Sequence, residues 1–177
     1  MNPAWHIRTA RLDLWPVGWG DLADLVAIKG DPSVFAVMLG GVRGPALVAE
    51  ELAADISAWA AFGYGVWAVR DLRSRAFRGL AGLQARPDRR GVAVRFAFWP
   101  EAQGRGFARE AAGAALRFGH EQAGLTRIIA VARDENIASR MVLGGIGMTE
   151  AERFMQSGYA MMLYESVRVS PTRTGLV

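Results

Sequence analysis

A glycine-rich segment between a strand that has to stop and a helix that can start is the strongest constraint on this chain. Residues 91–99 carry the apolar alternation of a strand, and Pro100 cannot continue the hydrogen-bond ladder of a sheet. Helix-forming residues run from Gly106 to Gln122, with Gly124 just past the end. The segment Gln103–Ala108 therefore has to turn tightly from a strand into a helix.

Such a turn predicts an anion-binding site. The first N–H groups of a helix have no internal partner, and glycines let the backbone approach a ligand closely. Hydrogen bonds to a charged group contribute about 1.5 to 3 kcal/mol each, whereas the helix dipole adds about 0.3 to 1 kcal/mol. We expect directed main-chain amides to bind a diphosphate here, with Arg105 and Arg109 adding positive charge.

Other phosphate and nucleophile motifs lack the residues that they need. The dinucleotide fingerprint requires a small residue where Arg109 stands, and a P-loop requires a Gly-Lys-Ser/Thr sequence that a chain with Lys29 as its only lysine does not contain. No serine lies in a Gly-x-Ser-x-Gly elbow. Cysteine is absent and there are only 2 histidines, so we expect no disulfide, no cysteine nucleophile and no metal site.

The remaining patterns predict alternating strands and helices in one domain. They indicate a strand over 7–14, helices over 21–30 and 45–62, a hairpin of strands at 66–69 and 79–83, a strand over 127–131, a helix over 138–143 and two final strands around a turn at Ser157-Gly158. This order predicts an α/β fold with a mixed sheet. We expect a single domain over residues 1–169 and a flexible tail over 170–177.

Charge and hydropathy exclude several classes of protein. The net charge is +4, and the arginines are scattered along the chain without forming a stripe for nucleic acid. No apolar run approaches the roughly 20 residues of a membrane helix, and the first residues lack the pattern of a secretory leader. We therefore expect a cytoplasmic protein that binds neither nucleic acid nor membranes.

Two motifs resemble those of a known family. The pattern Gln/Arg-x-x-Gly-x-Gly/Ala at residues 103–108 resembles the acetyl-CoA pyrophosphate loop of the GNAT superfamily of N-acyltransferases, and residues 100–111 resemble its ribosomal-protein N-terminal (Rim-type) acetyltransferase branch. Residues 134–139 match that branch's Glu-Asn-x-x-Ser, and Leu143–Met148 resembles the Leu-x-x-x-Gly-Phe that follows. With similar residues at 8–14 and 31–32, the resemblance spans roughly residues 7–164.

The resemblance implies a fold, a co-substrate and a set of binding residues. It implies a GNAT-like mixed, mostly antiparallel central sheet with splayed middle strands flanked by helices, and acetyl-CoA whose pantetheine lies in the gap between those strands. Dimers are common among such proteins, so a homodimer is compatible with it. The cofactor-binding residues that it implies are Phe98, Trp99, Gln103, Gly104, Arg105, Gly106, Phe107, Ala108, Asn136 and Ser139, with a main-chain N–H of Phe98 or Trp99 polarising the thioester.

The catalytic residues implied by the family are incomplete. Many members have a tyrosine acid seven positions after the motif asparagine, where this chain has Leu143, and a glutamate in the central strand, where it has Ala93. In the branch resembled, the serine of Asn-x-x-Ser has been proposed as the acid, which makes Ser139 the candidate, although a helix cap is an equally ordinary role for it. No base is evident.

Several other side chains have both a functional and a structural interpretation. Glu101 is more simply an exposed turn residue, His120 a surface or cap residue near a helix end, and Tyr159 and Tyr164 are weaker candidates for the acid. Five aromatic residues either wall an acceptor pocket or pack in the core, and core packing is favoured for all except Trp99. These residues are Trp15, Trp59, Tyr64, Trp67 and Trp99.

The predicted function is transfer of an acetyl group from acetyl-CoA to a primary amine. A lysine amine, with a pKa near 10.4, is about 2.5 units harder to deprotonate than an α-amine at about 7.7 to 8.0, which is a handicap of about 3.5 kcal/mol. Without a visible base, an α-amine of a protein N-terminus or a small molecule is favoured. The alternative, motivated by the missing tyrosine and glutamate, is a non-catalytic acyl-CoA-binding module.

Overall fold

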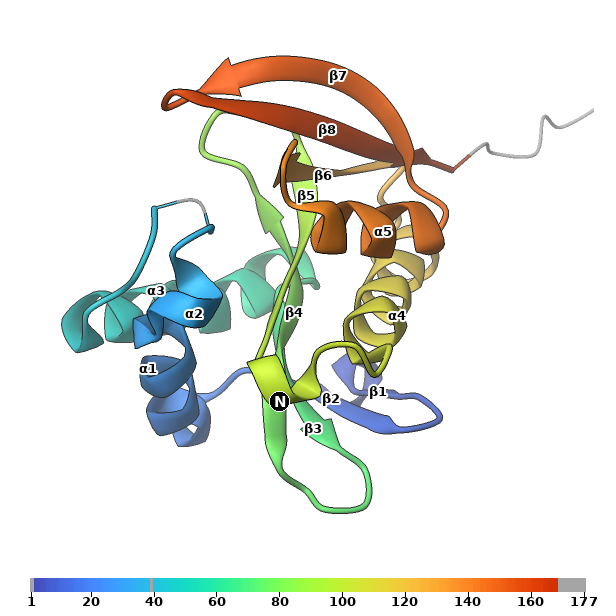
Figure 1. Cartoon of the computed structure of the whole chain (residues 1–177). Helices are drawn as coiled ribbons and strands as arrows, with labels where there is room; N and C mark the ends of the chain where they lie inside the picture. The colour runs from blue at the N-terminus through green and yellow to red at the C-terminus, as the bar shows by residue number, and fades with distance from the viewer. Residues whose placement is uncertain (1, 39, 169–177) are drawn as a thin grey trace, which may run out of the picture.

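The computed structural model describes residues 2–38 and 40–168, so the expected tail at 170–177 lies outside the described residues. An eight-stranded sheet runs through the molecule in the order β1-β2-β3-β4-β5-β6-β8-β7. Neighbouring strands are antiparallel except β5 and β6, which run parallel. Helices α1, α2 and α3 lie on one side and α4 and α5 on the other (Figure 1). The predicted mixed, mostly antiparallel sheet flanked by helices is confirmed.

Most elements lie where the sequence patterns predict them. The strands are β1 (Ile7–Arg8), β2 (Leu12–Pro16), β3 (Val66–Asp71), β4 (Phe77–Ala85), β5 (Val92–Phe98), β6 (Arg127–Arg133), β7 (Thr149–Gln156) and β8 (Tyr159–Val167). The α-helices are α1 (Leu22–Gly30), α2 (Pro32–Phe35), α3 (Pro45–Phe62), α4 (Phe107–Glu121) and α5 (Ile137–Gly145), and the short 3-10 helices are η1 (Pro3–Trp5), η2 (Trp19–Asp21) and η3 (Pro100–Ala102). Within these described ranges no helix is long and apolar enough to span a membrane.

The predicted first strand over 7–14 is wrong, because the chain reverses within it. β1 and β2 form an antiparallel hairpin. The N–H of Thr9 donates to the carbonyl of Leu12 at 2.9 Å, and the Thr9 hydroxyl accepts from the N–H of Leu12 at 3.0 Å. These local bonds close a tight turn. One of the two is made by the threonine side chain and not by a neighbouring strand.

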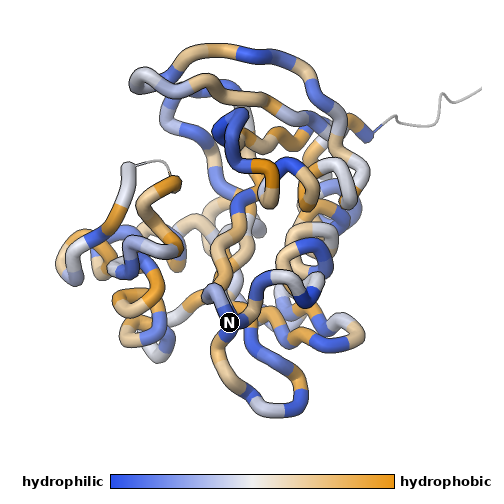
Figure 2. Tube along the Cα trace, viewed as in Figure 1, coloured by the Kyte–Doolittle hydropathy of each residue, from blue (hydrophilic) through white to orange (hydrophobic). Residues whose placement is uncertain are grey.

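Two apolar clusters pack on opposite faces of the sheet, because successive strand residues point to opposite sides. Phe98 belongs to the cluster under α4, together with Trp59 and Trp67, whereas its neighbour Ala97 belongs to the cluster under α1 and α3. Figure 2 shows the central strands largely in hydrophobic colours and the β3–β4 loop in hydrophilic ones. At the end of the sheet, β7 is mostly exposed and has a register shift between Glu150 and Glu152.

The two middle strands separate soon after they meet. Ala93 of β5 and Ile129 of β6 form the one pair that joins the strands in the described sheet. β5 continues to Phe98 and β6 to Arg133 without further pairing, so their carboxyl-terminal halves diverge. This is the predicted splay, and it leaves a gap in the sheet directly before the glycine-rich segment.

Glu110 of α4 holds the β1–β2 turn against the start of that helix. Its carboxylate accepts hydrogen bonds from the Thr9 hydroxyl at 2.6 Å, the Arg11 N–H at 3.0 Å and the Arg11 Nε at 2.7 Å. Burial by itself raises the pKa of Glu110, but these hydrogen bonds outweigh it and hold the pKa below its usual value. A motif glutamate therefore links two segments that are far apart in sequence.

We expect Glu110→Gln to lower the free energy of unfolding by about 1 to 3 kcal/mol at pH 7, because hydrogen bonds to a charged group are lost. The folded-state pKa of Glu110 is depressed, so its contribution is complete above the unfolded-state value near 4.5 and disappears as the pH falls through the folded-state value. Urea unfolding at pH 7 and at pH 3.5 measures both effects. Glu121→Gln, at an exposed position of the same helix, serves as the control and should change little. An equal deficit at both pH values would contradict the assignment.

Candidate active site

The glycine-rich segment has the backbone geometry of an anion cradle. Gly104 and Gly106 have φ angles of 68° and 79°, in the left-handed region that favours glycine. Gly106 is the residue that caps α4, and it carries no side chain that could bond to the first helical N–H groups. The turn between β5 and α4 is thus made by two glycines at the positions predicted.

The main-chain donors of this segment have no partner in the part of the chain that the structure describes. No hydrogen bond between described residues is donated by a main-chain N–H of residues 104–109. Residues 104–106 are exposed, so the donors of the loop itself lie at the surface, whereas Phe107, the first residue of α4, is buried. A run of free N–H groups at the start of a fifteen-residue helix is the arrangement that binds phosphate groups.

Arginine side chains surround the cradle. The guanidinium groups of Arg11 and Arg105 lie 4.7 Å and 5.0 Å from the centre of the Phe107 ring. Arg11 Nη1 also donates to the carbonyl of Arg105 at 2.8 Å, which holds the loop in place. An open groove of about 710 Å³ adjoins Gly106 and is lined by four arginines, Arg8, Arg11, Arg109 and Arg117. The surroundings therefore favour an anionic ligand.

The end of β5 turns its main chain toward the gap. The N–H of Trp99 donates to the carbonyl of Arg78 at 3.1 Å, so the pair Gly79–Phe98 is of the type without hydrogen bonds between its two residues. The N–H of Phe98 consequently points away from β4, toward β6. Of the two predicted thioester donors, Trp99 is already bonded and Phe98 is available. The Gln103 side chain donates to the Phe98 carbonyl at 3.1 Å.

A cavity of about 80 Å³ lies between β5, β6 and α5. It brings the predicted residues Asn136 and Ser139 together with the strand that precedes the cradle. Its lining includes Ala93 and Phe96 of β5, Ala132 of β6 and Leu143 of α5. No aspartate or glutamate is among the described residues that line it.

Ser139 is not the cap of α5. Asn136 has that role, since its Oδ1 accepts from the N–H of Ser139 at 3.1 Å. The Ser139 hydroxyl makes no hydrogen bond to another described residue, and it lines the cavity. Of the two interpretations of this serine, capping is therefore excluded.

The other candidate acids and bases are occupied elsewhere. The Tyr164 hydroxyl accepts from Arg140 Nε at 3.1 Å and donates to Glu150 at 2.9 Å, outside the cavity, and burial raises the pKa of Tyr164. Tyr159 is 44% exposed, with the Arg133 guanidinium over its ring. Neither tyrosine lines the cavity.

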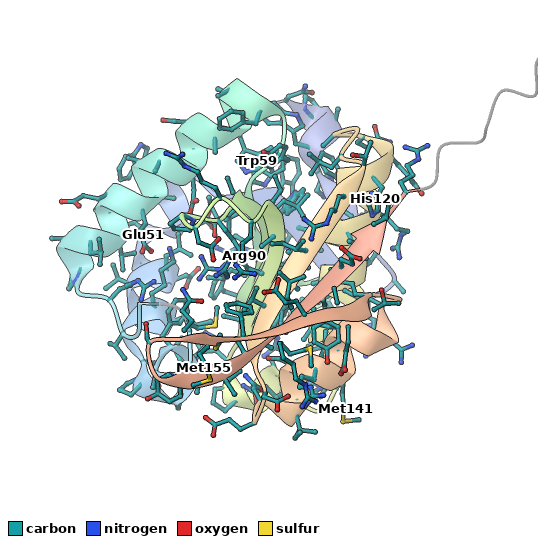
Figure 3. The ribbon with its side chains drawn as sticks, turned by 90° about the horizontal axis from the view of Figure 1, so that it is seen from above. Glu51, Trp59, Arg90, His120, Met141 and Met155 are labelled. Carbon is teal, nitrogen blue, oxygen red and sulfur yellow. The ribbon has the colours of Figure 1, made fainter. Side chains whose placement is uncertain are left out.

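His120 and Glu101 have structural or surface positions, as the simpler interpretation of the sequence predicts. His120 bonds to the Leu125 carbonyl at 2.6 Å and the Ser166 hydroxyl at 3.0 Å near the end of α4. Figure 3 shows it on the opposite side of the central strands from Glu51. Glu101 is exposed in η3.

The aromatic residues mostly pack in the core, as favoured. The rings of Trp59 and Trp67 meet edge to face at 4.7 Å in the cluster under α4. Trp15 is 39% exposed and stacks on His6. Tyr64 and Trp99 are partly buried against the core, and none of the five lines the cavity.

A second, polar cavity of about 150 Å³ was not predicted from the sequence. It lies against β4 and β5 on the side covered by α1 and α3, and it contains Asp55 and Gln84. Gln84 Nε2 donates to Asp55 Oδ1 at 2.7 Å, and burial raises the pKa of Asp55. The sequence does contain one indication of this cavity. Asp55 lies in line with Val48, Leu52 and Trp59 on the buried face of α3, where an apolar residue is normally found.

Comparisons with known proteins agree with this geometry. The family model described as "Acetyltransferase (GNAT) domain" matches residues 11–149. The FsC-acetyl coenzyme A-N(2)-transacetylase of Aspergillus fumigatus is 29% identical over 166 residues, which cover 84% of this chain and 66% of that protein, slightly less than two thirds of its length.

Solved structures show the same fold. An acetyltransferase from Agrobacterium tumefaciens str. C58 superposes with a TM-score of 0.80 at 22% identity, covering 92% of this chain and 94% of its own. The ribosomal L7/L12 alpha-N-protein acetyltransferase RimL, in complex with coenzyme A, superposes with a TM-score of 0.77 at 14% identity, covering 92% of this chain and 97% of its own.

We expect Gly106→Ala to weaken coenzyme A binding about tenfold or more. A Cβ in the left-handed region costs about 1 to 2 kcal/mol, and here it would also lie 3.3 Å from Arg11 Nη2. Both effects shift the N–H groups of the cradle. Calorimetric titration with coenzyme A measures the change in Kd.

Gly124→Ala is the matched control, because Gly124 has a φ of 69° and open space around it, past the other end of α4. It should carry a similar backbone strain and leave the Kd for coenzyme A unchanged. Equal losses of affinity in both variants would show that general strain, not the cradle, is being measured.

Proposed function

Because this chain belongs to the GNAT acetyltransferase family, we propose that it transfers an acetyl group from acetyl-CoA to a primary amine, preferably an α-amine of a protein N-terminus or a small molecule. The observation that carries this proposal is the run of N–H groups at residues 104–109 without a partner among residues 2–38 and 40–168. This run follows a strand that borders a gap in the sheet.

The co-substrate fits these features in order along its length. Its diphosphate would be bound by the N–H groups of residues 104–109, and its pantetheine would lie in the gap, where the main chain of Phe98 is unpaired by β6. Asn136 and Ser139 would contact it from α5. The arginine-lined groove beside Gly106 supplies positive charge for the remaining phosphate.

The reaction is direct attack of a neutral amine on the thioester carbonyl. A new C–N bond forms, the C–S bond breaks, and the amine proton passes to solvent. The N–H of Phe98 would stabilise negative charge on the carbonyl oxygen, and the Ser139 hydroxyl or a water would protonate the departing thiolate. Positioning of the two substrates supplies most of the acceleration.

The surroundings of the cavity support an α-amine as acceptor. No carboxylate lines it among the described residues, whereas Arg86, Arg95 and Arg133 do. Nearby positive charge favours the neutral form of an amine, and an α-amine is already the easier one to deprotonate. The Rim-type motifs at 100–111 and 134–139 support the same preference.

We expect a peptide with a free α-amine to be acetylated faster than an N-terminally blocked peptide with one lysine. The difference in pKa alone corresponds to a factor of about 300 in the neutral fraction. Release of coenzyme A, with the modified position read by mass spectrometry, measures the two rates at equal peptide concentrations. Faster acetylation of the lysine would overturn the preference for an α-amine.

We expect Ser139→Ala to lower kcat about 10- to 100-fold, a larger effect than that on the Kd for coenzyme A, because general-acid assistance typically contributes a factor of that order or more. Asn136 still caps α5, so the helix should remain intact. Steady-state kinetics and calorimetry measure the two quantities. An unchanged kcat would assign protonation to a water molecule.

A further inference from the structure

Arg95 of β5 stands where the two cavities meet. It lines the cavity of about 80 Å³ between β5 and β6, and also the polar cavity of about 150 Å³ on the side of α1 and α3. Met38, after α2, also lines both cavities, so the two cavities adjoin at Arg95 and Met38. A group bound by Arg95 in the first cavity would share that cavity with Ser139, the candidate acid.

The nearby carboxylates are already bonded to other groups. Arg95 Nη1 donates to Gln84 Oε1 at 3.2 Å, and Gln84 in turn donates to Asp55. Glu51 accepts from Lys29 at 2.7 Å and from Arg43 at 2.9 Å. The positive charge of Arg95 therefore has no direct carboxylate partner among the described residues. The amide of Gln84 links it to Asp55.

The remaining N–H groups of Arg95 face accessible space. Among the described residues, Arg78 Nε is the one buried side-chain nitrogen or oxygen without a hydrogen-bond partner. The nitrogens of Arg95 that make no hydrogen bond to a described residue are not among these buried atoms, so they are not fully buried. They therefore face the open volume of the cavities that Arg95 lines. Burial also lowers the pKa of Arg95, as expected of a guanidinium short of negative partners.

The other cations of the reaction cavity have partners. Arg86 Nη2 donates to Asp88 at 2.6 Å, and Arg133 lies 3.6 Å from Glu135 and over the Tyr159 ring. Among the described residues, those that line this cavity include three arginines and no carboxylate, so its lining is positive. It would repel a polycationic acceptor and attract an anionic one.

We infer that the acceptor is a small amine that carries a carboxylate, such as an amino acid or short peptide, and that Arg95 binds this carboxylate. A guanidinium presents a planar pair of donors that matches a carboxylate, and a bidentate bond would fix the distance and direction of the amine. The inference rests on the proposed function, since it assigns the acceptor of that reaction. It makes Arg95 the residue that determines specificity.

The first test compares acceptors that differ in one charge. Ala-Ala and its C-terminal amide have the same α-amine, and Ala-Glu-amide and Ala-Gln-amide place the carboxylate on a side chain instead. We expect kcat/KM for one carboxylate member to exceed that of its neutral partner about 10- to 100-fold, the range of charge-assisted hydrogen bonds. The pair that shows the preference identifies the position of the carboxylate.

The second test removes the guanidinium. Arg95→Met should abolish the preference by raising KM for the carboxylate substrate, so that kcat/KM becomes similar for the two members of a pair, while the Kd for coenzyme A is unchanged. Arg95→Lys should restore part of the preference through its charge. Arg73→Met, at an exposed position of the β3–β4 loop, is the matched control for loss of an arginine. Equal losses for both substrates in Arg95→Met would overturn the inference.

Binding without turnover separates this inference from the proposed function. Calorimetric titration of the coenzyme A-loaded protein with each dipeptide pair reads acceptor recognition directly. Acetylation of charged and neutral peptides at equal rates would overturn the carboxylate-binding role and leave the acetyltransferase proposal standing. Tighter binding of the carboxylate peptides, lost in Arg95→Met and unaccompanied by acetylation of any amine, would support the role of Arg95 and count against the proposed reaction.

Discussion

The separation of β5 and β6 is the constraint on which the rest of the site depends. A buried strand needs partners for its main-chain groups, and β5 has them on the β4 side along its whole length but on the β6 side only near Ala93. The N–H of Phe98 therefore remains available in the middle of the sheet, whereas its carbonyl accepts from the Gln103 side chain. A linear ligand with amide groups can act there as a substitute strand, and the cradle, the cavity and Ser139 all lie around that opening.

Several motif residues shape the site and leave ligand contact to the backbone. Gln103 bonds to the carbonyl of Phe98, Glu110 holds the β1–β2 turn, and Arg11 bonds both to Glu110 and to the carbonyl of Arg105. The side chains thus fix the loop, and the N–H groups of that loop remain free. The N-terminal segment thus supports the glycine-rich loop in this fold.

Features set by local chemistry could be predicted from the sequence, and features set by distant packing could not. The limits of α3 follow from Pro45 and Gly63, and the cradle follows from glycines placed between a strand stop and a helix start. The hairpin at Thr9 was missed because a side chain closes it, and the pattern of apolar residues does not show that. Arg95 gave no signal on its strand, since its environment is made by α1 and α3, whose positions are set by the tertiary fold.

The outer edge of the sheet bears on how copies of this chain can associate. β7 is the last strand, its side chains are mostly exposed and include Glu150, Glu152 and Arg153, and its ladder with β8 is interrupted between the two glutamates. Charged side chains and a bulge on an edge strand oppose the addition of another strand. Continuation of the sheet from one molecule into the next is therefore disfavoured at this border.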